Sequence, residues 1–356
     1  MRSGFDDTQA RQHASVRWRP QARAAVRLLS RLTVVFLFGF AASSCSSDSS
    51  PVGPAPVERS PFATDVASAE LLVSDISNFW TAYDEYLRTG SNSAFQASYL
   101  DRASSGLRDF INSRTLTASS IASMVDAYPR YFAGIRSVSA QLESGVTSEQ
   151  VRSGYSRLKE LYPPAVFPAV TFLIGRFSTG GTTANNRILI GSEFYLADPG
   201  VPLDELRPFQ HDSVHPLAFL PVIIAHEHTH VLQQQAQGIF GRKTLLEQSI
   251  LEGSADFIGE LVSGGNINAK IRDWAIPREH ALWVEFQAAM GGTDVSAWLY
   301  NQGNATADRP GDLGYFIGYR IAEAYFAKTA NKTQAVKDII EVNDAAAFLG
   351  ASGYNP

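Results

Sequence analysis

Cysteine is almost absent from this sequence of 356 residues, because Cys45 is its only cysteine. A single thiol excludes an internal disulfide framework and any zinc site built on cysteine ligands. The excess of charge of one sign is also small, since the formal net charge is -5, and no basic run occurs after residue 31. Without a basic surface the chain has no field that gathers nucleic acid, so we expect no nucleic-acid binding.

An apolar run long enough to cross a membrane is missing at the N-terminus. The run LTVVFLFGFAA, residues 32–42, would reach only about 16 Å as a helix, against roughly 30 Å of hydrocarbon core. Arginines precede this run, and small residues and a cysteine follow it, which is the order of a cleaved signal peptide. Ala42, Ser43, Ser44 and Cys45 resemble a bacterial lipobox, in which the cysteine is lipidated. A plain secretory signal with an incidental cysteine is the alternative.

These features predict four segments along the chain. Residues 1–44 form a lipoprotein signal peptide, and residues 45–61, rich in Ser, Pro and Gly, form a flexible tether. Residues 62–161 form a helical N-terminal region, and residues 162–356 form a second domain. In the helical region three- and four-residue spacing predicts one apolar face, formed by Leu72, Ile76, Phe79, Tyr83 and Leu87.

Two segments of the second domain have the composition of strands. AVTFLIGRF begins at Ala169 and RILIGSEFYL at Arg187, and the turn-like stretch STGGTTANN separates them. We therefore expect the two strands to pair as a hairpin. Helices are expected at residues 221–237, 245–263, 276–290, 314–330 and 333–342. The predicted fold class is mainly α with a small β-sheet, that is, α+β.

Three of the seven histidines lie in the pentapeptide HEHTH. On a helix, with about 100° per residue, His226 and His230 lie roughly 40° apart, so both imidazoles can reach one ion. Glu227 lies beside that face, whereas His228 points to the opposite side. This arrangement is the HExxH zinc motif, in which the glutamate acts as general base.

A hydrolytic zinc site usually takes three protein ligands. The later stretch LEGSADFIGE supplies Glu252 and Asp256 four residues apart on one helical face, and Gly259 on that face allows a second helix to approach. We assign Glu252 as the third ligand. Asp256 is expected to hold the other ring N–H of a ligating histidine and so to fix its tautomer.

HExxH followed by E-x-x-x-D resembles the gluzincin metallopeptidases, the thermolysin-like group, although the spacing from His230 to Glu252 is slightly longer than in thermolysin. The stretch from the expected hairpin through GYFIGYRIAEAYF also resembles a bacterial family of predicted zinc-dependent proteases related to gliding-motility-type lipoproteins. This resemblance implies a zincin-like metallopeptidase domain in which Tyr319, slightly favoured over Tyr315, could stabilise the oxyanion. An apolar core stripe is the alternative role of this pair. It also implies that RILIGSEFYL is the edge strand that binds an extended substrate.

The sequence thus predicts zinc-dependent peptide-bond hydrolysis by a metallopeptidase that is lipid-anchored through Cys45 in the bacterial cell envelope, facing the periplasm or the exterior. Peptide or protein is the expected substrate, Zn²⁺ the cofactor and Glu227 the general base. A noncatalytic envelope lipoprotein with a zincin scaffold and a zinc hydrolase of a non-peptide amide are the alternatives, and the intact Glu227 disfavours the first. Glu260 is expected to be a solvated helix residue, and ordinary surface or core roles are expected for His211, His215, His228 and His280.

Overall fold

The structure, a computed structural model, describes residues 60–306 and 308–356, which belong to one compact unit. The expected signal peptide, the lipidation at Cys45 and nearly all of the expected tether lie outside the described residues. Within the described ranges, no helix is both long and apolar enough to cross a membrane.

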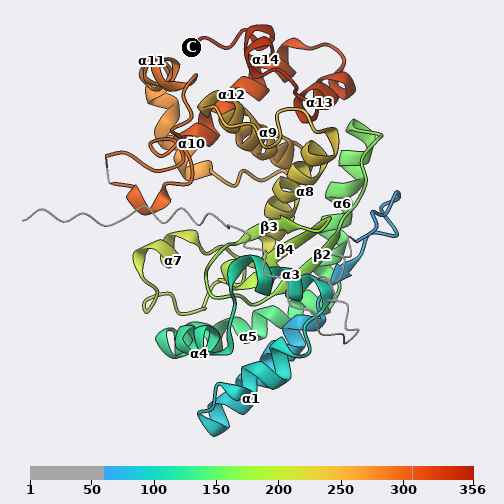
Figure 1. The fold of residues 1–356 in the computed structure, drawn as a ribbon, viewed down its shortest axis with the longest axis vertical. Coiled ribbons are helices and arrows are strands. Elements are labelled where there is room, and N and C mark those ends of the chain that lie inside the picture. Colours follow the sequence, from blue (N-terminus) through green and yellow to red (C-terminus); the bar gives the residue numbers. More distant parts are fainter. Residues whose placement is uncertain (1–59, 307) are drawn as a thin grey trace, which may run out of the picture. The chain divides into compact units, whose positions relative to one another are not determined.

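Helices form most of the described chain, around one small sheet (Figure 1). The helices before β2 are α1 (Ser74–Thr89), α2 (Ser93–Phe95), α3 (Ser105–Arg114), α4 (Ala118–Ala127), α5 (Pro129–Glu143) and α6 (Val146–Leu161), with the π-helical turn η1 (Gln96–Leu100) after α2. The helices after the sheet are α7 (Pro208–Ser213), α8 (Leu220–Ala236), α9 (Leu245–Ser263), α10 (Ala269–Ala275), α11 (Glu279–Ala289), α12 (Leu313–Lys328), α13 (Lys332–Ile340) and α14 (Ala345–Ser352). Short 3-10 turns are η2 (Ser192–Phe194), η3 (Leu217–Phe219), η4 (Ile276–Arg278) and η5 (Gln302–Asn304). The predicted α+β, mainly helical class is confirmed.

Helix α1 shows what apolar periodicity predicts and what it misses. Ile76, Phe79 and Tyr83 are buried, as the spacing predicts. Leu72 lies before the helix, in strand β1 (Leu71–Leu72), and Leu87 is 62% exposed. The predicted face is therefore too long at both ends, because periodicity indicates which side of a helix faces inward but not where its packing partners stop.

The sheet has the strand order β1-β2-β4-β3, with β2 at Ala169–Leu173, β3 at Gly181–Ala184 and β4 at Arg187–Gly191. The expected hairpin between the two apolar segments is wrong, because β2 and β4 pair in parallel. The antiparallel pair is β3 with β4. Every residue of β2 and β4 is buried. A continuous apolar run of this kind is typical of parallel strands covered on both faces.

Strand β3 lies within the stretch that the sequence suggested to be a turn. Only Asn185 and Asn186 turn the chain, with φ angles of 48° and 62°. Positive φ at both central residues is what a tight two-residue hairpin of type I′ requires, and asparagine tolerates it. As a result β3 is an edge strand of the sheet, whereas β4 has a neighbour on each side. The expectation that RILIGSEFYL forms the edge is therefore wrong.

Helices α8 and α9 carry the two motifs and begin and end close to where the sequence predicts. Helix α8 ends at Ala236, and Gln237 rather than Gly238 takes the left-handed conformation, with φ 64°. Helix α9 begins with a capping box, in which Thr244 and Glu247 satisfy each other's backbone N–H groups.

Glycines allow α9 to pack closely against both of its helical neighbours. A Cβ atom on Gly259 would lie 3.4 Å from the backbone nitrogen of His226 on α8. On the other side, a Cβ on Gly253 would lie 2.1 Å from the backbone nitrogen of Tyr319, and one on Gly318 only 1.6 Å from the Ser249 carbonyl oxygen. Only glycine fits at the two positions where α9 meets α12, whereas a Cβ on Gly259 would make an ordinary van der Waals contact with α8. Helix α12 therefore crosses α9 backbone to backbone.

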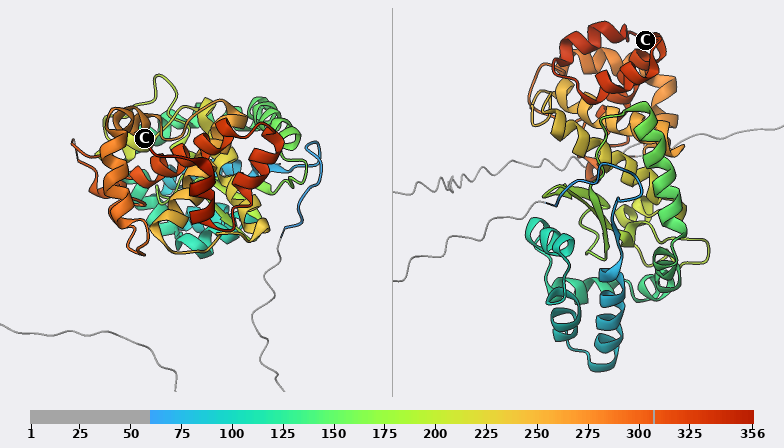
Figure 2. Two further views of the ribbon diagram at one scale, coloured as in Figure 1. Left: turned by 90° about the horizontal axis from the view of Figure 1, so that it is seen from above. Right: turned by 90° about the vertical axis from the view of Figure 1, so that its right-hand side faces the viewer.

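The predicted boundary between residues 62–161 and 162–356 stays a prediction. One hydrophobic cluster extends from α1 to α14, and β1 joins the sheet beside β2. Figure 2 shows the green strands between the cyan and teal helices of the first half and the olive helices α8 and α9. Both halves thus contribute to the surroundings of the sheet.

Candidate metal centre

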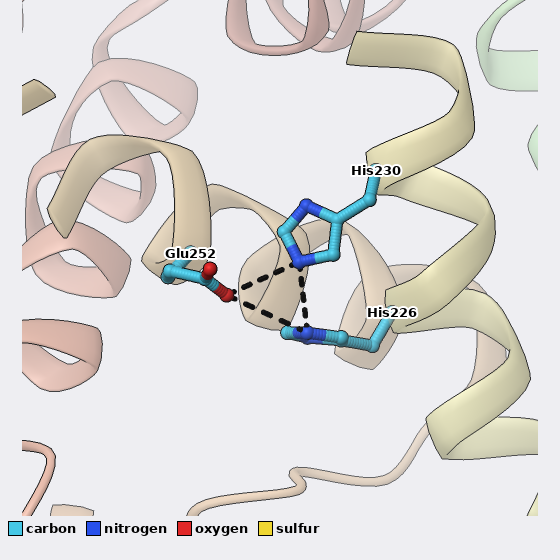
Figure 3. Close-up of side chains that lie close together, drawn as sticks. All are labelled: His226, His230 and Glu252. Carbon is cyan, nitrogen blue, oxygen red and sulfur yellow. Dashed lines mark hydrogen bonds and ion pairs between the residues drawn. The ribbon is translucent and has the colours of Figure 1, made fainter. Parts of the chain in front are cut away.

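Three side chains from α8 and α9 point toward one another (Figure 3). His226 and His230 lie one turn apart on α8, and their Nε2 atoms are 3.1 Å apart. The Oε2 atom of Glu252, on α9, lies 3.1 Å from Nε2 of His230 and 3.8 Å from Nε2 of His226. Ligand atoms of these three residues lie within 4.8 Å of one another, so one ion can contact all of them.

The opposite nitrogen of each imidazole has its own acceptor. Nδ1 of His226 lies 2.8 Å from a carboxylate oxygen of Asp256, as expected for the E-x-x-x-D stretch, and Nδ1 of His230 lies 2.8 Å from Oε1 of Gln233. The Gln233 amide is oriented because its Nε2 donates to the Leu251 carbonyl and to the Ser254 hydroxyl. This network assigns the proton of each neutral ring to Nδ1.

The two Nε2 atoms consequently present lone pairs to each other and to the Glu252 carboxylate. Three acceptors at these distances repel one another unless a cation lies between them. In a metal-free site that cation is a proton on one imidazole. Two imidazoles and one carboxylate are also the donor set of many catalytic zinc sites, so these residues fit zinc.

The pKa values of Glu252 and His230 also show that a positive charge is favoured between these side chains. Burial opposes the charged form of Glu252, but the neighbouring His230 and His226 rings lower the pKa of Glu252 to about 2. Burial likewise opposes a charged His230, yet the Glu252 carboxylate raises the pKa of His230 to about 9. The site therefore favours a cation against its carboxylate.

Outer contacts hold the carboxylates in place. The Tyr300 hydroxyl donates to Oε1 of Glu252 at 2.7 Å, which leaves Oε2 facing the histidines. Nδ2 of Asn268 donates to Oδ2 of Asp256 at 2.6 Å. Neither of these residues, nor Gln233, is among the site residues predicted from the sequence. Gln233 follows His230 by three residues, one helical turn, and could have been found by that spacing, whereas Tyr300 and Asn268 precede helices on loops and leave no periodic signal.

Glu227 is buried next to the metal-binding group and faces strand β3. A Cβ atom on Gly181 would lie only 2.6 Å from Oε1 of Glu227, so the strand passes directly against this carboxylate. Among the described residues no group hydrogen-bonds to it. Burial raises the pKa of Glu227, and the charges of His226, His230 and Arg114 partly offset this effect. A carboxylate with a raised pKa is a stronger base, which suits Glu227 to accept a proton.

The two tyrosines of α12 have different surroundings. The Tyr315 ring stacks at 6.5 Å from the His226 ring and lies 6.2 Å from the Tyr300 ring. The Tyr319 hydroxyl instead donates to Glu260 at 2.7 Å and accepts from Arg272. The structure therefore places Tyr315, and not Tyr319, beside the histidines. Glu260 is correspondingly not a solvated helix residue, because Tyr319 and Arg272 both contact it.

The remaining histidines lie outside the metal-binding group. Nε2 of His228 donates to the Val166 carbonyl at 2.6 Å, and burial lowers the pKa of this ring to about 4. His228 is thus a neutral core residue on the far side of α8. His215 stacks on Phe219 at 4.2 Å, while His211 and His280 are exposed.

The fold and the site define a mainly helical α+β protein with a buried His-His-Glu group that can hold a metal ion. Residues 194–344 match the model of a family described as "Predicted Zn-dependent protease (DUF2268)". This segment contains α8, α9 and α12, and so the whole His-His-Glu group. The match supports a zinc-dependent protease. No curated protein and no solved structure gave a significant match.

Proposed function

We propose that the protein is a gluzincin-type zinc peptidase. The observation that carries this proposal is the convergence of two imidazole lone pairs and one carboxylate, with both tautomers fixed, beside the buried carboxylate of Glu227. His226, His230 and Glu252 would hold the zinc ion. When bound, zinc polarises the scissile carbonyl and makes water more acidic.

Glu227 supplies the proton transfers in this proposal. Its carboxylate accepts a proton from the attacking water and delivers it to the leaving amide nitrogen. The raised pKa of Glu227, which burial causes, suits both steps because the group must gain and lose the proton in one cycle. Asp256 and Gln233 are positioning residues, since they act only through the histidine rings.

Strand β3 is the proposed binding edge for an extended peptide or protein substrate. An extended peptide adds to an exposed sheet edge through main-chain hydrogen bonds. Gly181 of β3 leaves no side chain between the strand and Glu227, so a substrate carbonyl can lie close to both. This assignment replaces β4, which is interior.

Tyr315 is the better candidate for stabilising the oxyanion, because the Tyr319 hydroxyl is held by Glu260. Tyr315→Phe should lower kcat by about 10²- to 10³-fold, as for other lost oxyanion donors. Tyr319→Phe is the matched control and should leave kcat unchanged. The reverse result would return the role to Tyr319.

We further propose that the enzyme is anchored to a bacterial envelope membrane by lipid at Cys45. The signal-like order of residues 1–45 supports this proposal. Cys45→Ala should yield a precursor that no longer partitions into detergent, because acyl chains rather than the short apolar run provide the anchor. Unchanged membrane retention would contradict the lipid anchor.

The test of the catalytic proposal is Glu227→Gln in the full-length protein. Zinc content, measured by elemental analysis, should remain near one ion per chain, whereas cleavage of a random peptide library should fall by about 10²- to 10⁴-fold. Glu260→Gln, on α9, is a control that should keep both properties. If Glu227→Gln cleaves peptides at the wild-type rate, the mechanism is wrong. If wild-type protein binds zinc but cleaves no peptide, the noncatalytic scaffold is favoured instead.

A further inference from the structure

Arg114, the last residue of α3, extends its side chain to the edge strand of the sheet. Its Nη2 donates to the Thr182 hydroxyl on β3 at 2.9 Å. Its Nε is buried and has no hydrogen-bond partner among the residues that the structure describes. In the part of the chain that the structure describes, no carboxylate lies within 4.0 Å of this guanidinium, nor of Arg176, which donates to the Arg114 carbonyl. Two cations therefore lie at this edge without a fixed anion.

The strand register shows which face of the sheet Arg114 occupies. Thr171 on β2 lies opposite Leu189 on β4, and Leu189 lies opposite Thr182 on β3. Residues directly opposite one another project to the same face of a sheet. A Cβ on Gly106 of α3 would lie 2.1 Å from the Thr171 hydroxyl, so this face is the one that α3 covers. Thr182 and Arg114 therefore contact each other on the face of the sheet that α3 covers.

Glu227 lies on the other face. Successive residues of a strand project to opposite faces, and Gly181, directly before Thr182, faces Glu227 of α8. Figure 1 shows α8 and α3 at the same sheet, close to β3. A peptide paired with β3 would alternate in the same way, so neighbouring substrate residues would face the catalytic glutamate and the arginine in turn.

From this geometry we propose that Arg114 binds a substrate carboxylate at the residue opposite Thr182, next to the substrate residue that faces Glu227. The proposal rests on the proposed peptidase function and deepens it, because it gives the enzyme a preference for an anionic residue beside the cleaved bond. A guanidinium has several N–H donors in a plane and binds carboxylates with two parallel hydrogen bonds. The free Nε is one such donor.

The position of Arg114 at a helix end does not by itself explain these contacts. A basic residue in the last turn interacts favourably with the helix dipole, and Arg88 in the last turn of α1 does so while it stays exposed. Arg114 instead buries an N–H without a partner. Leaving a buried donor unsatisfied costs free energy, which a bound carboxylate would recover.

The test compares two random peptide libraries with detergent-purified, zinc-loaded full-length protein. In the first library the C-termini are amidated, so only side chains carry carboxylates, and in the second they are free. We expect Asp and Glu to be enriched roughly 10- to 100-fold over Asn and Gln at one position beside the cut in the amidated library. Enrichment of cuts near the free C-terminus alone would identify the terminal carboxylate as the bound group.

Variants of Arg114 separate a binding role from a structural role. Arg114→Gln should abolish the enrichment of acidic over amide residues, and Arg114→Lys should retain part of it. Arg114→Glu should reverse the preference toward Lys and Arg. Arg88→Gln, which removes the same charge from another helix end, is the control and should leave the preference intact.

A binding measurement keeps this inference separate from the proposed function. Zinc-loaded Glu227→Gln protein is titrated with a blocked pentapeptide that carries one central Glu and with its Gln counterpart, and Kd is measured by calorimetry. We expect roughly 10-fold or tighter binding of the Glu peptide, and loss of that difference when Arg114→Gln is added. No cleavage by the wild type would contradict the peptidase, whereas equal binding of the two peptides, or a preference that survives Arg114→Gln, would overturn the role of Arg114.

Discussion

Glu252 and Glu260 lie two turns apart on α9, and each contacts a different kind of partner. Glu260 forms an ion pair with Arg272 at 3.1 Å and accepts the Tyr319 hydroxyl, so the chain itself supplies the balancing cation. Glu252 faces two imidazole lone pairs, and among the described residues its only other hydrogen-bond partner is the neutral Tyr300. A carboxylate with a fixed cation is therefore structural, whereas one that faces lone pairs is available to a metal.

The largest expected difference between the two sites is in zinc binding. Loss of an outer contact typically weakens metal affinity by about 10- to 100-fold. Glu252→Ala should weaken zinc affinity by more than this, because it removes a direct ligand. Glu260→Ala should leave affinity unchanged. Elemental analysis and competition with a zinc-binding dye measure both. Stoichiometric zinc in Glu252→Ala would mean that Glu252 is not a ligand.

Glu193 is a buried carboxylate that forms no ion pair with any described residue. It accepts the backbone N–H groups of Gly175 and Phe177, both at 2.9 Å, and burial raises its pKa from 4.5 to about 7. Below pH 4.5 the group is protonated whether the chain is folded or unfolded. As the pH rises toward 7 the unfolded state ionises first, so the free energy of unfolding should fall by about 3 kcal/mol relative to Glu193→Gln. Denaturant unfolding of both proteins from pH 4 to 8 measures this difference, and a constant difference would show that the pKa is not raised.

Asp256→Asn tests whether the outer contact matters less than the ligand itself. The amide can present its nitrogen instead of an acceptor to Nδ1 of His226, so the ring would no longer be held in one tautomer. Zinc affinity should fall by about 10- to 100-fold, and excess zinc should restore activity. Loss of activity that saturating zinc does not restore would instead place Asp256 in the proton transfer.

The smallest effect is expected when the cation of the structural pair is removed. Arg272→Met leaves Glu260 without its ion partner, but both side chains are about 30% exposed and water screens them. The free energy of unfolding should decrease by about 1 kcal/mol, less at high salt, and zinc content should not change. Lower zinc content in Arg272→Met would show that the two ends of α9 are coupled.

Residues that lie on one helix were predictable from the sequence. His226, Glu227 and His230 depend only on α8, and Glu252 and Asp256 only on α9, because helical geometry fixes the direction of side chains three or four residues apart. The mainly helical class was predictable for the same reason, since apolar periodicity repeats along each element.

Contacts between distant elements were decided by the tertiary structure. Two apolar strands with a turn-like segment between them fit a hairpin as well as a parallel pair, and only packing on both faces selects the parallel pair and makes β3 the edge. The close crossing at Gly253 and Gly318 sets the rotation of α12, which places Tyr315 beside His226 and Tyr319 against Glu260.

The sequence by itself determined the chemistry of the candidate site, because a short motif on one helix carries its own geometry. The tertiary structure decided what surrounds that chemistry: Gln233, Asn268 and Tyr300 as outer contacts, and Arg114 at the edge strand. Apart from Gln233, these residues come from loops and helices whose approach depends on the packing of the whole unit. Local spacing holds no information about such packing, since it is set by contacts between residues far apart in the chain.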